Sequence, residues 1–155
     1  MKKIITNLCM IHQHPRVLLG MKKRGFGVGK WNGYGGKVKE NESIEEALYR
    51  EVEEEGNIQI KNPFKLGILE FEFPHTSLVI ENHIYKVKEF LGEPVETEEM
   101  RPEWFNVEEM PFAEMWLDDP YWIHMFLADK KFKGKFVFGK NEEILSYQLE
   151  EVEEI

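Results

Sequence analysis

The sequence predicts an α/β fold in which a mixed β-sheet lies between helices. Several segments show the apolar spacing of β-strands, and two segments with helical periodicity interrupt them. The chain has 155 residues, of which 42% are hydrophobic and 32% are charged, an ordinary composition for a globular domain with a sizeable core. We therefore expect residues 1–155 to form a single domain.

The first part of the chain is predicted to be a hairpin followed by two glycine-rich loops. Residues 3–12 indicate a buried strand, and residues 16–21 indicate its partner. Residues 22–30 form a basic loop that holds Phe26, and the second loop leads into a helix that ends near Gly56.

The rest of the chain is predicted to contain five strands and one helix. In order, these are long strands at 66–73 and 78–90 around a turn at 74–76, an acidic loop at 93–99, a short strand at 104–105, a helix at about 121–130 opened by Asp119 and Pro120, and a closing hairpin of strands 132–138 and 144–152.

The first helix carries carboxylates on its apolar face. Ser43 and Glu46 have the spacing of a capping box, and the core face is predicted to hold Ile44, Ala47, Leu48 and Val52. Glu51 and Glu55 fall in the same arc, and Glu54 lies at its edge. Three carboxylates there would repel one another and lose hydration, so a hard divalent cation with oxygen ligands is the natural partner. The alternative is a solvated acidic helix.

The spacing of this segment decides between the two interpretations. From Gly36 to Ile58 it reads G-x5-E-x7-R-E-V-x-E-E-x-N-I. This resembles the Nudix box, in which a glycine stands at the place of Asn57. Since Asn tolerates a positive φ better than most residues, we expect the helix to end there as usual. The resemblance implies the Nudix fold, an α/β/α sandwich.

Further segments resemble one branch of that family, the MutT-type 8-oxo-dGTP diphosphatases that also act on 2-hydroxy-dATP. These segments are residues 16–27, 31–37, 99–105, 115–119 and 121–122. The resemblance implies that Asn32, Asp118 and Asp119 recognise an oxidised purine. It also implies aromatic and apolar contacts to the base from Trp116, Phe26, Phe71, Phe73, Met100 and Trp122. An amide offers both donor and acceptor, and two carboxyls that share a proton can do the same.

The resemblance also implies the reaction, in which water attacks a phosphorus and releases a nucleoside monophosphate and pyrophosphate, sanitising the nucleotide pool. The implied cofactor is Mg²⁺, with Mn²⁺ as a substitute, held by Glu51, Glu54, Glu55, the Gly36 carbonyl and Glu99. Either Glu51 or Glu99 would take the proton from water. Arg50 would fix a helix carboxylate, and Lys22 and Lys37 would contact phosphate.

Structural alternatives exist for several of these residues. Asp119 before Pro120 has the pattern of a helix N-cap. The tryptophans Trp116 and Trp122 and the strand residues Phe71 and Phe73 could be core aromatics. Asn7 stands where the branch has Thr, which puts a contact there in doubt. His12 and His14 resemble a metal pair but lack further ligands nearby in sequence.

Two other functions remain open at this point. One is a Nudix hydrolase of another substrate, such as ADP-ribose or a dinucleoside polyphosphate, which the set of Asn32, Asp118 and Asp119 disfavours. The other is a non-catalytic nucleotide-binding module, which would be expected to lose carboxylates from the helix.

The composition of the chain limits which kinds of binding partner are expected. The formal net charge of −9 argues against a nucleic-acid polymer, whose phosphates need a basic surface. No apolar run approaches the roughly 20 residues of a membrane span, and no signal peptide is recognisable. Cys9 is the only cysteine, so no internal disulfide can form. These features favour a cytoplasmic monomer that acts on a small nucleotide.

Overall fold

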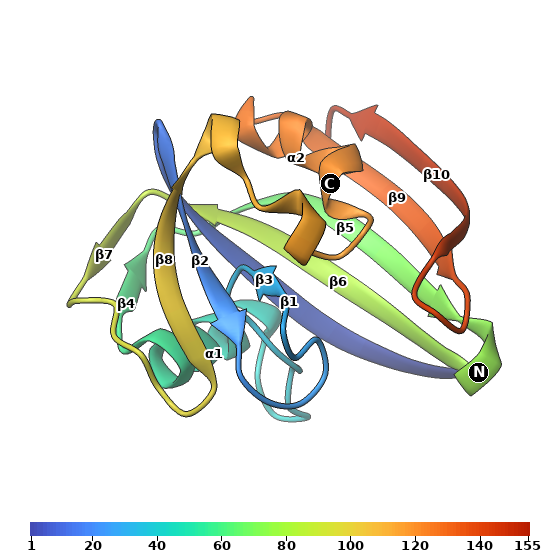
Figure 1. The fold of residues 1–155 in the computed structure, drawn as a ribbon, viewed down its shortest axis with the longest axis horizontal. Helices are drawn as coiled ribbons and strands as arrows, with labels where there is room; N and C mark the ends of the chain where they lie inside the picture. Colours follow the sequence, from blue (N-terminus) through green and yellow to red (C-terminus); the bar gives the residue numbers. More distant parts are fainter.

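In the computed structural model, which describes all residues from Met1 to Ile155, eight strands form one mixed sheet and two more form a small second sheet (Figure 1). The large sheet has the order β10–β9–β5–β6–β1–β2–β3, and β8 pairs with the other side of β2. Its strands are β1 (Lys2–Gln13), β2 (Arg16–Lys22), β3 (Trp31–Asn32), β5 (Phe64–Phe73), β6 (Leu78–Val87), β8 (Met100–Asn106), β9 (Lys131–Phe138) and β10 (Ile144–Val152). The β1–β6 and β5–β9 pairs are parallel and the others antiparallel, which confirms the predicted mixed sheet.

Two helices cover opposite faces of this sheet. They are α1 (Ile44–Gly56) and α2 (Asp119–Leu127), shown in teal and orange in Figure 1. Alternation along β1 shows the two faces directly: Cys9 and Ile11 belong to the core on the α1 side, and Leu8 and Met10 belong to the core on the α2 side. The predicted arrangement of a sheet between helices is therefore confirmed.

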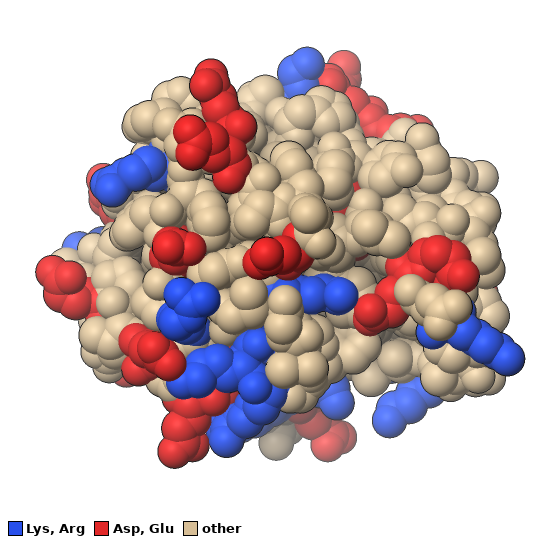
Figure 2. Space-filling view, viewed as in Figure 1, with Lys and Arg blue, Asp and Glu red and all other residues tan.

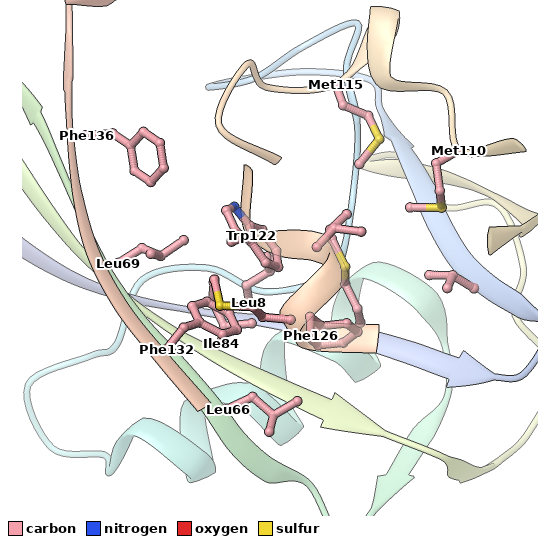
Figure 3. Close-up of a cluster of buried hydrophobic side chains, with 14 of the residues drawn as sticks. Leu8, Leu66, Leu69, Ile84, Met110, Met115, Trp122, Phe126, Phe132 and Phe136 are labelled. Carbon is pink, nitrogen blue, oxygen red and sulfur yellow. The ribbon is translucent and has the colours of Figure 1, made fainter. Parts of the chain in front are cut away.

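The larger core lies between α2 and the sheet. Figure 3 shows Trp122 and Phe126 of α2 directed toward Leu8, Ile84 and Phe132 of the strands, all of them buried. The Trp122 and Phe132 rings stack with centroids 5.5 Å apart. This packing fixes the start of α2 above the sheet, where the candidate site lies.

The ends of α1 form as the sequence predicts. Ser43 and Glu46 complete the capping box, since each side chain accepts from the other's backbone N–H. The helix ends at Asn57, which adopts the left-handed conformation with φ 58°. Asn57 thus performs the structural task of the glycine it replaces.

The predicted strand at 78–90 is wrong in its last three residues. It stops at Val87, and residues 89–91 form a separate strand, β7 (Glu89–Leu91), which pairs with β4 (Gln59–Lys61) in the second sheet. Pairing of β6 with β1 ends where Val87 lies opposite Ile11, and the exposed Lys88 and Glu89 then interrupt the apolar run. The short strands β3, β4 and β7 carry too little periodicity to be predicted.

Two other boundaries differ from the prediction. The strand expected at 104–105 is the seven-residue β8, which tolerates Pro102 because an edge strand does not need every N–H in the ladder. The second helix ends at Leu127 rather than near Lys130, because Asp129 turns to φ 59° and Lys130 donates its N–H back to Met125.

The connections contain three short 3-10 helices, η1 (Pro74–Thr76), η2 (Val107–Glu109) and η3 (Phe112–Glu114). None of the helices is both long and apolar enough to cross a membrane.

Candidate active site

A cavity of about 410 Å³ opens between the start of α2, the sheet and the glycine loop before α1. One end is lined by the loop and by Glu55, and the other by aromatic rings and the pair Asp118 and Asp119. Segments that lie far apart in the sequence therefore share a single cavity.

The glycine loop lies flat against β1. Tyr34 exchanges two backbone hydrogen bonds with Cys9, and the Gly36 carbonyl accepts the N–H of Asn7 at 3.0 Å. A Cβ on Gly36 would come within 2.6 Å of the Glu51 carboxyl carbon. A larger residue at position 36 would therefore push the Glu51 carboxylate away from the loop backbone.

Asn7 fixes this loop to the helix. Its side-chain oxygen accepts the N–H of Gly36 at 3.0 Å, and its amide nitrogen donates to the Ile44 carbonyl at 3.2 Å. From the sequence, the only question about Asn7 was whether it contacts substrate. The structure shows that this buried amide connects the glycine loop with the start of α1.

Arg50 holds three carboxylates of the α1 region. Its guanidinium donates to both oxygens of Glu42, at 3.0 and 2.6 Å, and to Glu51 at 2.8 Å and Glu54 at 3.3 Å. The hydrogen bonds from Arg50 lower the pKa of Glu42 to about 2. Arg50 pairs with helix carboxylates as the sequence predicts. Glu42, which lies inside the motif but for which no role was predicted, supplies the bidentate partner.

Glu55 is the buried carboxylate of the group. It is 2% exposed, accepts the Gly35 N–H at 2.8 Å and lies 3.5 Å from the ammonium of Lys22. Burial raises the pKa of Glu55 to about 7, although Gly35 and Lys22 oppose this shift. Lys22, predicted to contact phosphate, therefore faces Glu55 in this structure, while Lys37 lines the cavity beside Gly36.

The residues of this end fit a hard divalent cation by their chemistry. Their donors are carboxylate oxygens, and the buried Glu55 needs more positive charge nearby than Lys22 supplies. The structure shows no group of three such side chains placed to hold a metal ion; Glu51 is paired with Arg50, and Glu55 with Lys22. Glu99 lies across from α1, 3.5 Å from Arg24, and its charge contributes to the raised pKa of Glu55.

The other end of the cavity holds two aspartates with no basic partner. Asp118 and Asp119 are 2% and 3% exposed. Trp122 donates its indole N–H to Asp118 at 2.9 Å, whereas Oδ2 of Asp119 has no partner in the protein. Burial raises the pKa of Asp118 to about 6, and burial together with the Asp118 charge raises that of Asp119 further. The two carboxyls therefore retain a proton more readily than exposed aspartates do.

The N-cap interpretation of Asp119 is wrong. The N-cap position belongs to Asp118, whose side chain makes no capping bond, and Asp119 is the first residue of α2. Helix capping therefore does not explain either carboxyl.

Aromatic rings enclose the space beside these carboxyls. Phe26 stacks on Trp116 with ring centroids 5.1 Å apart, and Phe73 stacks on Phe138 at 5.2 Å. Phe71 packs 5.9 Å from Phe138, so the face shared by Phe71 and Phe73 is a cavity wall as well as core. Met100 lines the cavity from β8 but is nearly fully buried, as is Trp122.

Asn32 comes from the short strand β3. Its side-chain oxygen accepts the N–H of Gly33 at 2.8 Å, and the residue lines the cavity. Half of its amide is thus already used to shape the loop, which the sequence does not reveal.

Charges of both signs are interspersed over this face of the molecule. In Figure 2, Lys and Arg side chains gather at the lower centre of the view, with acidic side chains beside them. The basic loop after β2 is paired with acidic residues: Lys23 with Glu96, and Arg24 with Glu98 and Glu99.

Comparison with known proteins decides the family. The model of the NUDIX domain matches residues 2–126. This chain belongs to the NUDIX family. This Nudix hydrolase is 47% identical to the mouse oxidized purine nucleoside triphosphate hydrolase over 149 residues. The alignment covers 96% of each chain. It is 44% identical over 153 residues to the zebrafish protein of the same name, covering 99% of this chain and 97% of that one.

Solved structures agree with this assignment. The fold matches the crystal structure of a MutT protein from Bacillus halodurans with a TM-score of 0.84 and 30% identity, over 95% of this chain and 97% of that one. Nudix hydrolases generally need a divalent metal ion, in keeping with the carboxylates at the α1 end of the cavity.

The histidine pair noted in the sequence lies outside this cavity. His12 and His14 are in contact, with ring nitrogens 3.2 Å apart, and no third metal-binding side chain joins them. They adjoin Lys86 and Lys88 at the opposite end of β1 and have no part in the Nudix site.

Proposed function

We propose that this Nudix hydrolase cleaves oxidised purine nucleoside triphosphates, such as 8-oxo-dGTP and 2-hydroxy-dATP, to the monophosphate and pyrophosphate with Mg²⁺. The observation that carries the proposal is the buried pair Asp118 and Asp119, which shares one cavity with Glu55 and the glycine loop. The names of the mouse and zebrafish relatives support the same substrate class.

The base end suits an oxidised purine because its groups both donate and accept. An aspartate pair that keeps one proton both donates and accepts, and Asn32 has amide N–H groups to offer. Oxidation at C8 or C2 of a purine changes which ring atoms carry hydrogen. A carboxyl pair that can move its proton suits both patterns, and Trp116 would stack on the base.

At the α1 end, Glu51, Glu54 and Glu55 would hold Mg²⁺, with oxygens from Gly36 and Glu99. The cation, which Mn²⁺ could replace, would neutralise the phosphates and lower the pKa of water. Arg50 fixes the Glu51 carboxylate, and Glu51 or Glu99 accepts the proton of the attacking water. Water adds to phosphorus as the bond to pyrophosphate breaks, and Lys22 and Lys37 bind the phosphate oxygens.

We also propose that residues 1–155 act as a single-domain cytoplasmic monomer on nucleotides, without nucleic-acid or membrane partners.

Hydrolysis of 8-oxo-dGTP beside dGTP tests the proposal, with Mg²⁺ present or chelated and with products resolved. We expect the oxidised nucleotide to be preferred and to give pyrophosphate rather than phosphate. A panel including ADP-ribose and dinucleoside polyphosphates separates this function from other Nudix reactions. Activity on those compounds alone would reject the substrate, and no metal-dependent turnover on any of them would favour a binding module.

A further inference from the structure

A polar pair lies in the apolar floor of the cavity, apart from the metal-binding carboxylates and the aspartate pair. The parallel register of β1 and β6 places Thr6 opposite Asn82, and both line the cavity. The Thr6 hydroxyl donates to the side-chain oxygen of Asn82 at 2.9 Å. The two side chains thus act as one unit of the sheet floor.

The surroundings of this pair are apolar. On the same face of the sheet, the preceding row holds Ile4 and Ile80, and the following row holds Leu8 and Ile84. Across from Asn82 on β5 lies Leu69, which is fully buried. A polar side chain in such a row is costly unless its hydrogen-bonding groups find partners.

Only half of the Asn82 amide has a partner. Its oxygen is used by Thr6, whereas its nitrogen, with two N–H donors, makes no hydrogen bond within the protein. This nitrogen is not sealed in the core, because Asn82 lines the cavity and is only partly buried. The donor is thus available to whatever occupies the cavity.

We propose that Asn82 is a specificity-determining residue of the nucleotide pocket, donating an amide N–H to an oxygen of the bound nucleoside while Thr6 fixes its orientation. The inference rests on the proposed function for the identity of the ligand. The oxygen belongs either to the base or to a sugar hydroxyl, which are the same chemistry for an N–H donor. Asn32, Asp118 and Asp119 approach from β3 and α2, so Asn82 on the sheet contacts a different edge of the nucleoside.

Enzyme kinetics with Asn82→Val, Thr6→Val and the control Glu81→Gln test this role. Glu81 is adjacent on β6 but faces the other side of the sheet, where it binds Lys3 and His83. We expect Asn82→Val to raise KM about threefold to tenfold, the range for one hydrogen bond. Its kcat should change by less than about twofold, because the proposed contact is to the nucleoside and not to the reacting phosphate. Thr6→Val should raise KM less, and Glu81→Gln should leave it unchanged.

The substrate series identifies the oxygen. The variants are assayed with 8-oxo-dGTP, 2-hydroxy-dATP, the ribonucleotide 8-oxo-GTP and the 3′-deoxy form of 8-oxo-dGTP. A KM effect that disappears for a nucleotide lacking one sugar hydroxyl assigns the contact to the sugar. An effect that differs between the two bases assigns it to the base, and both outcomes support the inference.

An unchanged KM for Asn82→Val on every substrate, with an unchanged melting temperature, would overturn the inference while leaving the proposed function intact. If Asn82→Val does not fold, Asn82→Ser and Thr6→Val take its place, and unchanged KM values in both would overturn the inference equally. If the wild type hydrolyses none of these nucleotides, the proposed function fails. Calorimetric binding of 8-oxo-dGMP to wild type and Asn82→Val then decides this inference separately, with equal affinity, or no binding by either protein, counting against it.

Discussion

The carboxylates around α1 and those at the start of α2 are neutralised in different ways. On α1, the permanent charge of Arg50 is shared by Glu42, Glu51 and Glu54. At the start of α2, no cation acts on Asp118 or Asp119, and burial raises the pKa of both. A guanidinium keeps carboxylates ionised, while burial without one makes them retain a proton. The first arrangement suits a cation and the second suits a hydrogen-bonding ligand.

Removing one carboxylate charge from α1 should have the largest effect on turnover. We expect Glu55→Gln to lower kcat by at least about 100-fold, because a carboxylate ligand of the metal is lost. The melting temperature without metal should hold or rise, since Gln can still accept from Gly35 and no charge is buried. Steady-state assays with Mg²⁺ and calorimetry without it measure both. Near wild-type turnover would remove Glu55 from the metal site.

Removing a charge from the base end should instead change specificity. Asp119→Asn mimics a permanently protonated carboxyl and keeps its size. We expect the ratio of kcat/KM for 8-oxo-dGTP and 2-hydroxy-dATP to change by about 10-fold or more, since the two bases present different donors and acceptors. Asp118→Asn serves as the matched variant. Unaltered ratios in both would mean that the pair does not recognise the base.

Asn32→Ala should weaken recognition of the base without weakening metal binding. Loss of a donor to the base costs roughly 1–3 kcal/mol, or about 5-fold to 150-fold in kcat/KM for 8-oxo-dGTP. Binding of Mn²⁺, followed by electron paramagnetic resonance, should remain as in wild type, because Asn32 is at the base end. A preserved preference for 8-oxo-dGTP over dGTP would exclude Asn32 from base recognition.

The smallest expected effect is on the way the stability of the fold depends on pH. Asp118 binds protons up to about pH 6 in the folded protein, and Asp119 to a higher pH, whereas an unfolded aspartate loses its proton near pH 4. The folded state therefore binds more protons between these values, and stability must fall as pH rises through this window. Asp119→Asn should make the loss of stability with rising pH less steep, and it should raise the melting temperature at pH 7 by about 3 °C. Scanning calorimetry without metal or nucleotide checks this, and an equally steep fall in the variant would mean that Asp119 is ionised in the free protein.

Sequence patterns predicted what depends on local spacing and missed what depends on tertiary contact. The capping box of Ser43, the end of α1 at Asn57 and the pairing of Arg50 with helix carboxylates all follow from short-range offsets. The roles of Asn7 and Asn82 could not be predicted, because their partners lie 29 and 76 residues away. For the same reason, the two-residue strand β3 is recognisable only from its pairing with β2.

The burial of Cys9 has a chemical consequence. The thiol is fully buried between the sheet and α1, and burial raises its pKa well above the ordinary value. Thiolate is the nucleophile that attacks peroxides, so this buried, protonated sulfur should be inert to them. The structure offers oxidants no accessible cysteine, and Met10, Met100, Met110, Met115 and Met125 are buried as well. Met1 is exposed and Met21 is half-buried, so oxidation of the folded protein should begin at these two methionines.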